Sequence, residues 1–189
     1  MNQRSLVMLI GLLMAVISSA QSPVSVVEQV RRSRDAAAAG NVNESLALAR
    51  DAVRQDPAYG EAWRQLATML ARTGNRSEAL QAFETATKLN PNDAPAWRDY
   101  GWILWAEGRR PEAVQAFEKA VALNIPQKED LAIQVLASYS EQGKPDEALE
   151  IFQRWVPGSS VLDPAVKLVE KGRTVAARPL LEKAWAAKE

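Results

Sequence analysis

A repeat of 34 residues constrains this chain more than any other feature of its sequence. Trp63 and Trp97 lie 34 positions apart, and the same spacing recurs in further pairs: Gly74 and Gly108, Ala79 and Ala113, Phe83 and Phe117, Ala86 and Ala120. Five features in phase define two neighbouring units, 60–93 and 94–127. Such a repeat predicts stacked supersecondary elements, because one unit alone cannot bury its apolar face.

The repeat extends in both directions with weaker agreement. A unit at 26–59 keeps glycine, alanine and proline at the matching positions but has Gln29 where the next unit has Trp63. Beyond residue 127 the spacing becomes 35, which gives a fourth unit at 129–157. Residues 158–189 align only at a spacing of 29, as a degenerate repeat or a pair of capping helices. The sequence therefore predicts an array over 26–157 and a separate C-terminal segment.

Each unit has the pattern of a helix, a turn and a second helix. Residues 60–72 and 94–107 carry apolar side chains at helical spacing. Gly74 and Gly108 follow them, where the end of a helix favours a residue with left-handed backbone geometry. In the C-terminal segment the shorter spacing predicts a short first helix at 164–171.

Small residues recur where the two helices of a unit should approach each other. Ala67 and Gly101 on the first helices are expected to face Ala79 and Ala113 on the second helices. Larger aromatic side chains are expected to fill the core: Trp63, Phe83 and Trp97.

These positions resemble the tetratricopeptide repeat family, whose pattern is W-x2-L-G-x2-Y, then A-x3-F, then P. The matching residues run Trp63-x2-Leu66-Ala67-x2-Leu70, then Ala79-x3-Phe83, then Pro91. The resemblance implies an all-α fold: a right-handed superhelical solenoid of stacked antiparallel helix pairs. It also implies that the first helices form an inner groove in which a segment of a partner protein binds.

The composition excludes several kinds of chemistry. The chain has no Cys and no His, so disulfides, thiol nucleophiles, Ser-His-Asp triads and zinc sites with nitrogen or sulfur ligands are ruled out. No phosphate-binding loop or nucleophile elbow is present either. The 23 basic and 23 acidic residues give zero net charge, which provides no general attraction to nucleic acid. We therefore expect a protein that is not an enzyme, with no cofactor, no metal and no nucleic-acid partner.

The first twenty residues have the pattern of a secretory signal peptide. Arg4 precedes an apolar run from Leu6 to Ile17, and small residues lead to a candidate cleavage site after Ala20. The pattern predicts export, to the periplasm or the exterior, of a mature chain that makes no membrane contact. The alternative is an uncleaved anchor that holds the chain at the inner membrane.

Candidate binding residues follow from the resemblance, by position on the first helices. Carried over residue by residue, the candidate set is Arg34, Arg64, Thr68, Arg72, Arg98, Trp102, Trp105 and Ile133. Arg64 and Arg98 occupy the same position in neighbouring units and are expected to stand side by side. Trp102 and Trp105 lie off the apolar stripe of their helix, so they are expected to be open to a partner. The alternative is that the tryptophans pack against a neighbouring helix and the arginines pair with Glu61, Asp99 or Asp130.

The expected function is that of a non-catalytic exported scaffold that binds a protein or peptide segment. Among bacterial proteins with this resemblance, such scaffolds serve envelope assembly or export. Two alternatives stay open: a structural envelope protein that associates with itself as a homo-oligomer, and a cell-wall glycan-binding module. The second would use Trp102 and Trp105 as a stacking platform.

Overall fold

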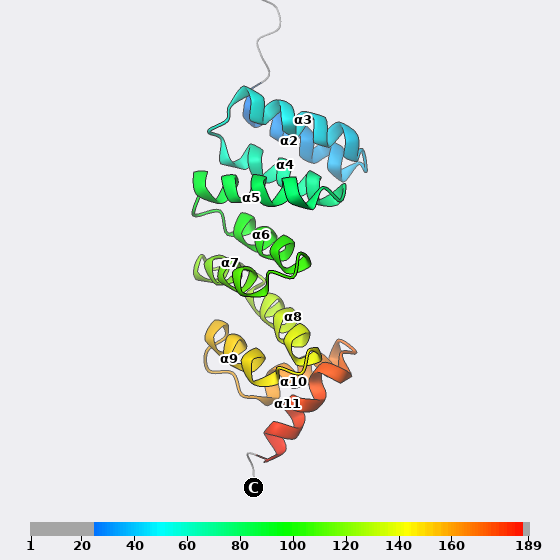
Figure 1. The fold of residues 1–189 in the computed structure, drawn as a ribbon, viewed down its shortest axis with the longest axis vertical. Coiled ribbons are helices and arrows are strands. Elements are labelled where there is room, and N and C mark those ends of the chain that lie inside the picture. Colours follow the sequence, from blue (N-terminus) through cyan, green and yellow to red (C-terminus); the bar gives the residue numbers. More distant parts are fainter. Residues whose placement is uncertain (1–24, 187–189) are drawn as a thin grey trace, which may run out of the picture. The chain divides into compact units, whose positions relative to one another are not determined.

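The computed structural model describes residues 25–186, and within them the chain forms ten α-helices and no strands (Figure 1). This confirms the all-α fold of stacked antiparallel helix pairs. The signal-peptide prediction concerns residues 1–20, which lie outside the described residues. None of the described helices is both long enough and apolar enough to cross a membrane.

The helices follow one another as five pairs, each joined by a short turn. In chain order they are α2 (Val26–Ala38) and α3 (Val42–Gln55), α4 (Gly60–Arg72) and α5 (Arg76–Leu89), α6 (Ala94–Ala106) and α7 (Arg110–Ala122), α8 (Lys128–Glu141) and α9 (Pro145–Trp155), and α10 (Leu162–Glu170) and α11 (Thr174–Ala186).

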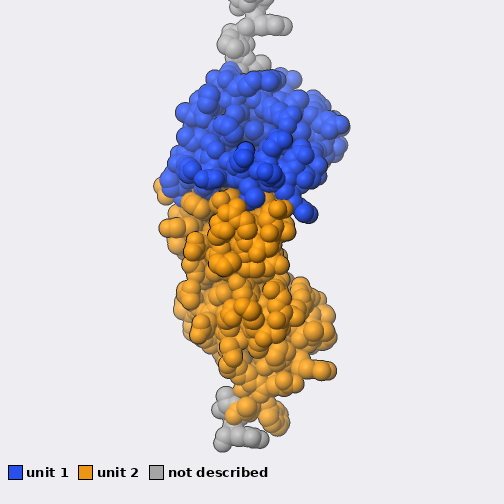
Figure 2. Space-filling view, in the orientation of Figure 1, with its two compact units in different colours: residues 1–91 blue, residues 92–189 orange. Residues whose placement is uncertain are grey.

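The chain divides into two compact units, coloured blue and orange in Figure 2. Unit 1 ends at Pro91 and contains α2 to α5, whereas unit 2 begins at Asn92 and contains α6 to α11. The division falls inside the array that the repeat predicts, and each unit has its own core.

In unit 1, α4 packs against all three of the other helices. The closest approach of α2 and α3 carries two buried serines: the Ser33 hydroxyl donates to the Ser45 carbonyl at 2.8 Å, and the Ser45 hydroxyl donates to the Ser33 carbonyl at 2.7 Å. The Gln65 amide of α4 donates to the Ser33 hydroxyl at 3.0 Å. These bonds satisfy the buried polar groups and fix three helices against one another.

In unit 2, both helices of the last pair pack against α8. Buried side chains therefore surround α8 along most of its length. Three ion pairs reinforce the attachment to α8: Lys167 to Glu129 at 2.8 Å, Lys171 to Asp130 at 3.0 Å and Arg173 to Glu141 at 2.7 Å. A fourth, Lys183 to Asp146, joins α11 to α9.

The structure buries only some of the aromatic side chains that the sequence predicts for the core. Phe83 is fully buried, and Phe117 is buried in the following repeat. Trp63 and Trp97 are half-buried, and Trp97 packs against the buried side chains of Ala94, Ala120 and Ile125. The Trp63 indole N–H donates to the Pro57 carbonyl at 2.8 Å, so the ring covers the loop between α3 and α4.

Candidate functional site

Unit 1 gathers arginines on the first helices of its two pairs. α2 and α4 pack side by side, and Arg34 on α2 forms an ion pair with Glu61 on α4. Arg64, one turn further along α4, reaches the same Glu61 oxygen at 3.4 Å. One carboxylate is thus held by arginines from two helices.

Tyr59 completes this arrangement from the loop before α4. Its hydroxyl donates to the other oxygen of Glu61, and this bond, with partial burial, raises the pKa of Tyr59. Burial alone would raise the pKa of the Glu61 carboxyl, but the hydrogen bonds from Tyr59 and Arg34 and the charges of Arg34 and Arg64 outweigh it. The pKa of Glu61 is therefore held below its ordinary value, and the group is ionised at neutral pH.

Two further candidates lie on the same helices. The Thr68 hydroxyl donates to the Arg64 carbonyl at 2.9 Å, so its proton is used within α4. Arg72 is exposed and makes only a long contact, 3.5 Å, to the Ala37 carbonyl of α2. We call this surface the arginine face and define it by Arg34, Glu61, Arg64, Thr68 and Arg72. With three arginines and one carboxylate, it carries excess positive charge.

Unit 2 presents a second surface, a hollow of about 410 Å³ that we call the Arg98–Trp102 pocket. Arg98 and Trp102 come from α6 and the remaining lining from the region of α8 and α10: Gln127, Asp130, Leu131, Gln134 and Lys171. Arg98 pairs with its neighbour Asp99 at 2.7 Å, and Asp130 pairs with Lys171 at 3.0 Å. The pocket is therefore polar and its charges are locally balanced.

Two of the candidate residues are not open to a partner. Ile133 is 2% exposed and lies on α8, the helix against which both helices of the last pair pack. Trp105 is 9% exposed: its ring packs at 5.5 Å from that of Tyr139, and the Arg110 guanidinium lies 4.2 Å from the ring centre. The expectation that these two side chains are open to a partner is wrong.

Trp102 is half-buried, with its ring edge-on to Phe117 at 4.9 Å. The Trp102 and Trp105 rings meet at 71°, so they do not form the flat platform that the glycan-binding alternative requires. The alternative to open arginines was that they pair with nearby acidic residues. Arg64 does pair with Glu61, and Arg98 pairs with Asp99. These arginines belong to different units, and their side-by-side placement stays a prediction.

The sequence reasoning missed the residues that organise these surfaces. Tyr59 precedes its helix and has no aromatic counterpart one repeat later, where Asp93 stands, so periodicity could not find it. Lys171 lies where the spacing shortens to 29 and the repeat is weakest, and its partner Asp130 belongs to another unit. Among the described residues, no cluster of three or more acidic side chains is placed to hold a metal ion.

Two family models match parts of the chain. Residues 70–127 match the tetratricopeptide repeat, and residues 20–93 match the bacterial transcriptional activator domain. No curated protein sequence matches the chain significantly.

Solved structures share the fold at low sequence identity. The crystal structure of MamA is 20% identical with a TM-score of 0.64, over 83% of this chain and 86% of its own. YrrB, described as a TPR protein with an unusual peptide-binding site, is 19% identical with a TM-score of 0.60, over 90% and 89% of the two chains. The second TPR domain of Spaghetti (RPAP3), bound to the HSP90 peptide SRMEEVD, is 18% identical with a TM-score of 0.51, over 53% and 93%. These likenesses concern the fold, and together with the match over 70–127 they support a tetratricopeptide repeat protein.

Proposed function

We propose that this chain is a non-catalytic scaffold whose arginine face binds an acidic segment of another protein. The observation that carries the proposal is the convergence of Arg34 and Arg64, from two packed helices, on one carboxylate, Glu61. Arg72 adds a third, exposed guanidinium further along α4, next to the Ala37 carbonyl of α2. The repeat fold supports the same conclusion, since the RPAP3 structure holds the acidic HSP90 peptide SRMEEVD and YrrB has a peptide-binding site.

The chemistry of the arginine face suits a carboxylate ligand. A guanidinium has five N–H donors in a planar fork, and Arg34 uses only one in a hydrogen bond to Glu61. Glu61 holds the guanidinium of Arg34 in place, which lowers the entropy that a ligand must remove on binding. An incoming Asp or Glu side chain would then add charge-assisted hydrogen bonds to donors that are already ordered.

We further propose that the scaffold is exported and serves envelope assembly or export in a bacterium. The support is the signal-peptide pattern of residues 1–20. Expression of the full chain followed by cell fractionation and mass spectrometry tests this part on its own. A periplasmic product that begins at Gln21 is the expected result, and a full-length cytoplasmic product would contradict it.

Peptide binding tests the proposed function. Fluorescence anisotropy would compare a labelled peptide rich in Glu and Asp with one in which every acid is replaced by Lys. We expect binding of the acidic peptide only, weakened about tenfold or more by the double change Arg34→Ala and Arg72→Ala, since hydrogen bonds to charged groups contribute about 1.5–3 kcal/mol each.

The matched control is Arg50→Ala, which removes an exposed arginine from an ion pair between α3 and α5, away from the arginine face. This variant should bind the acidic peptide like the unaltered chain. Equal weakening by Arg50→Ala, or equal binding of the acidic and basic peptides, would refute the assignment.

A further inference from the structure

The last helix pair exposes an unusual amount of apolar surface. Six large apolar side chains on these two helices are exposed: Leu162, Val166 and Val169 on α10, and Val175, Leu181 and Trp185 on α11. Val175 and Trp185 are each 74% exposed. Val169, Val175 and Leu181 line one hollow of this pair, whereas Leu162 and Val166 line another, next to Phe152 of α9. The α11 side of the pair is the surface considered below, and it goes beyond the function proposed above.

The repeat register shows what kind of surface this is. Leu181 occupies the position of Phe83, Phe117 and Phe152 in the earlier units. Those three phenylalanines are 1%, 0% and 1% exposed, whereas Leu181 is 38% exposed. In stacked-repeat proteins, a face of this kind is normally covered by a neighbouring unit. The α10–α11 pair instead presents a face of the kind that is buried in the earlier units.

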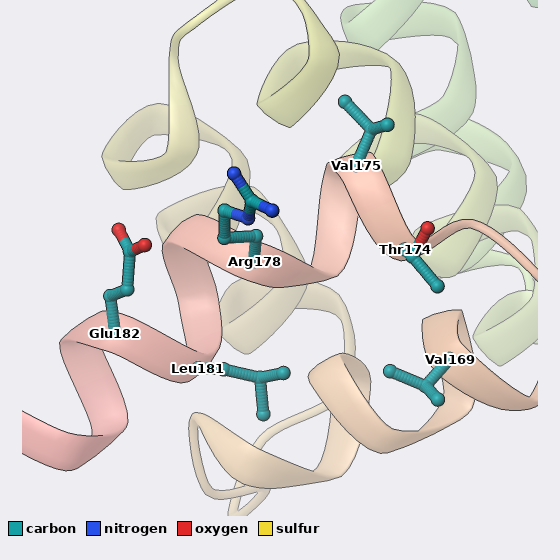
Figure 3. Close-up of a pocket in the computed structure, with 6 residues that line it drawn as sticks. All are labelled: Val169, Thr174, Val175, Arg178, Leu181 and Glu182. Atoms are coloured by element: carbon teal, nitrogen blue, oxygen red, sulfur yellow. The ribbon is translucent and has the colours of Figure 1, made fainter.

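The outer side of α11 forms one continuous stripe. Ala176, Ala177, Leu180 and Ala184 are buried on the inner side, and the opposite side carries Val175, Arg178, Glu182 and Trp185, with Leu181 turned toward α10. Figure 3 shows Val169 of α10 and Leu181 of α11 pointing into the space between the two helices, with Val175, Arg178 and Glu182 along α11. These residues line a hollow of about 430 Å³.

The stripe on α11 is complementary to itself. Val175 and Trp185 each lie five residues from Leu180, and Arg178 and Glu182 each lie two residues from it. A two-fold axis at Leu180 would therefore place Trp185 against Val175 of a second copy and Arg178 against its Glu182. Neither Arg178 nor Glu182 forms an ion pair within the described chain, and both are exposed.

We propose that a second copy of this chain covers this face, with the two α11 helices antiparallel about a two-fold axis. Such an isologous contact uses the same patch on both copies and closes on itself. Each copy would bury apolar side chains that are now exposed, and each interface would contain two Arg178–Glu182 ion pairs.

The test is the solution mass of the full chain, measured by light scattering over a range of concentrations. We expect a concentration-dependent dimer. Arg178→Glu alone and Glu182→Arg alone should each raise the dimer dissociation constant about tenfold or more, because each juxtaposes like charges. The double variant Arg178→Glu/Glu182→Arg should restore the dimer.

Mixing the two single variants makes the test sharper. A heterodimer of Arg178→Glu with Glu182→Arg places opposite charges at both contacts, so the mixture should dimerise although each variant alone does not. Lys119→Glu, an exposed charge reversal on α7, is the matched control and should leave the dimer unchanged. A monomer at all concentrations, or a dimer that ignores the charge of residues 178 and 182, would overturn the proposal.

Discussion

The helix pairs depend on single small residues at the points where two backbones come closest. Ser33, Ala67 and Gly101 occupy one repeat position, and Ser45, Ala79 and Ala113 occupy its counterpart on the second helices. All six are buried, and the Ser33–Ser45 hydrogen bonds show the contact directly in the first pair. This pattern is plain in the two central units, where alanine and glycine recur, but it is hidden in the first unit because serine replaces alanine there.

Gly101 is the most constrained of these positions. A Cβ atom there would clash with Cε1 and Cδ1 of the Phe117 ring. Phe117 cannot give way easily, because its ring has three tryptophan neighbours, Trp102 at 4.9 Å and Trp105 and Trp155 each at 6.2 Å.

We therefore predict that Gly101→Ala destabilises the protein. Overpacking of this kind costs about 1–3 kcal/mol, against the roughly 1 kcal/mol by which alanine favours a helix over glycine. Urea denaturation should show the loss, and the same change made in a Phe117→Leu background should cost little. A Gly101→Ala chain as stable as the original would argue against this packing.

Glu61 makes the stability of unit 1 depend on pH in the acid range. Its pKa is lowered in the folded chain, so its contribution is complete above the ordinary glutamate value of 4.5 and is lost as the pH falls through the folded value. We predict that Glu61→Gln lowers the stability at pH 7. The difference between variant and original should shrink as the pH falls well below 4.5.

Thermal unfolding at several pH values measures this difference. The Arg50→Ala variant, which breaks a separate ion pair, serves as a comparison for nonspecific effects. A difference between Glu61→Gln and the original that stays constant down to strongly acidic pH would count against the assigned role of this carboxylate.

Among the helices, the last pair shows most clearly where sequence reasoning succeeds and fails. The spacing predicts a short helix at 164–171, and α10 is indeed short but begins earlier, at Leu162. Its start is fixed by reciprocal bonds between Ser160 and Asp163: the Ser160 N–H donates to the Asp163 carboxylate at 2.7 Å, and the Asp163 N–H to the Ser160 hydroxyl at 3.3 Å. This capping-box signal was present in the sequence.

The attachment of this pair to α8 could not be predicted from the repeat. The candidate groove residues were chosen by their position on the first helices, which assumes that successive repeats stack regularly. On that assumption the Ile133 side chain should be open to a partner. It is buried instead, on the helix that the α10–α11 pair contacts. The burial of Trp105 has a similar cause, because it depends on Tyr139 and Arg110 from other helices. Residues on α2 and α4 were easier to place, because their two pairs keep the 34-residue register.

Ion pairs hold the last helix pair to α8, and reversing their charge should loosen it. We predict that Lys167→Glu with Lys171→Glu, which opposes Glu129 and Asp130 with like charges, speeds amide hydrogen exchange in α10 and α11. The effect should be modest, since each exposed pair contributes about 0–1 kcal/mol. Adding Glu129→Lys and Asp130→Lys should restore protection, and unchanged exchange in the first variant would show that the pairs do not contribute.

At the scale of the whole molecule, each unit carries its own candidate surface. Unit 1 has the arginine face, with ordered donors and excess positive charge, and unit 2 has the Arg98–Trp102 pocket, whose ion pairs are satisfied locally. The fold class followed from the 34-residue period together with the resemblance to the tetratricopeptide repeat, because these fix how the helices alternate. The class of ligand could not be predicted in this way, because it depends on which charged side chains pair with one another across helices.

Nuclear magnetic resonance of the isotope-labelled full chain, titrated with the acidic peptide, tests the central claim most directly. We predict that the amide signals that shift belong to α2 and α4 and that these shifts disappear when Arg34 and Arg72 are replaced by alanine. Shifts confined to α3 and α5, or none at peptide concentrations that saturate the anisotropy signal, would contradict binding at the arginine face.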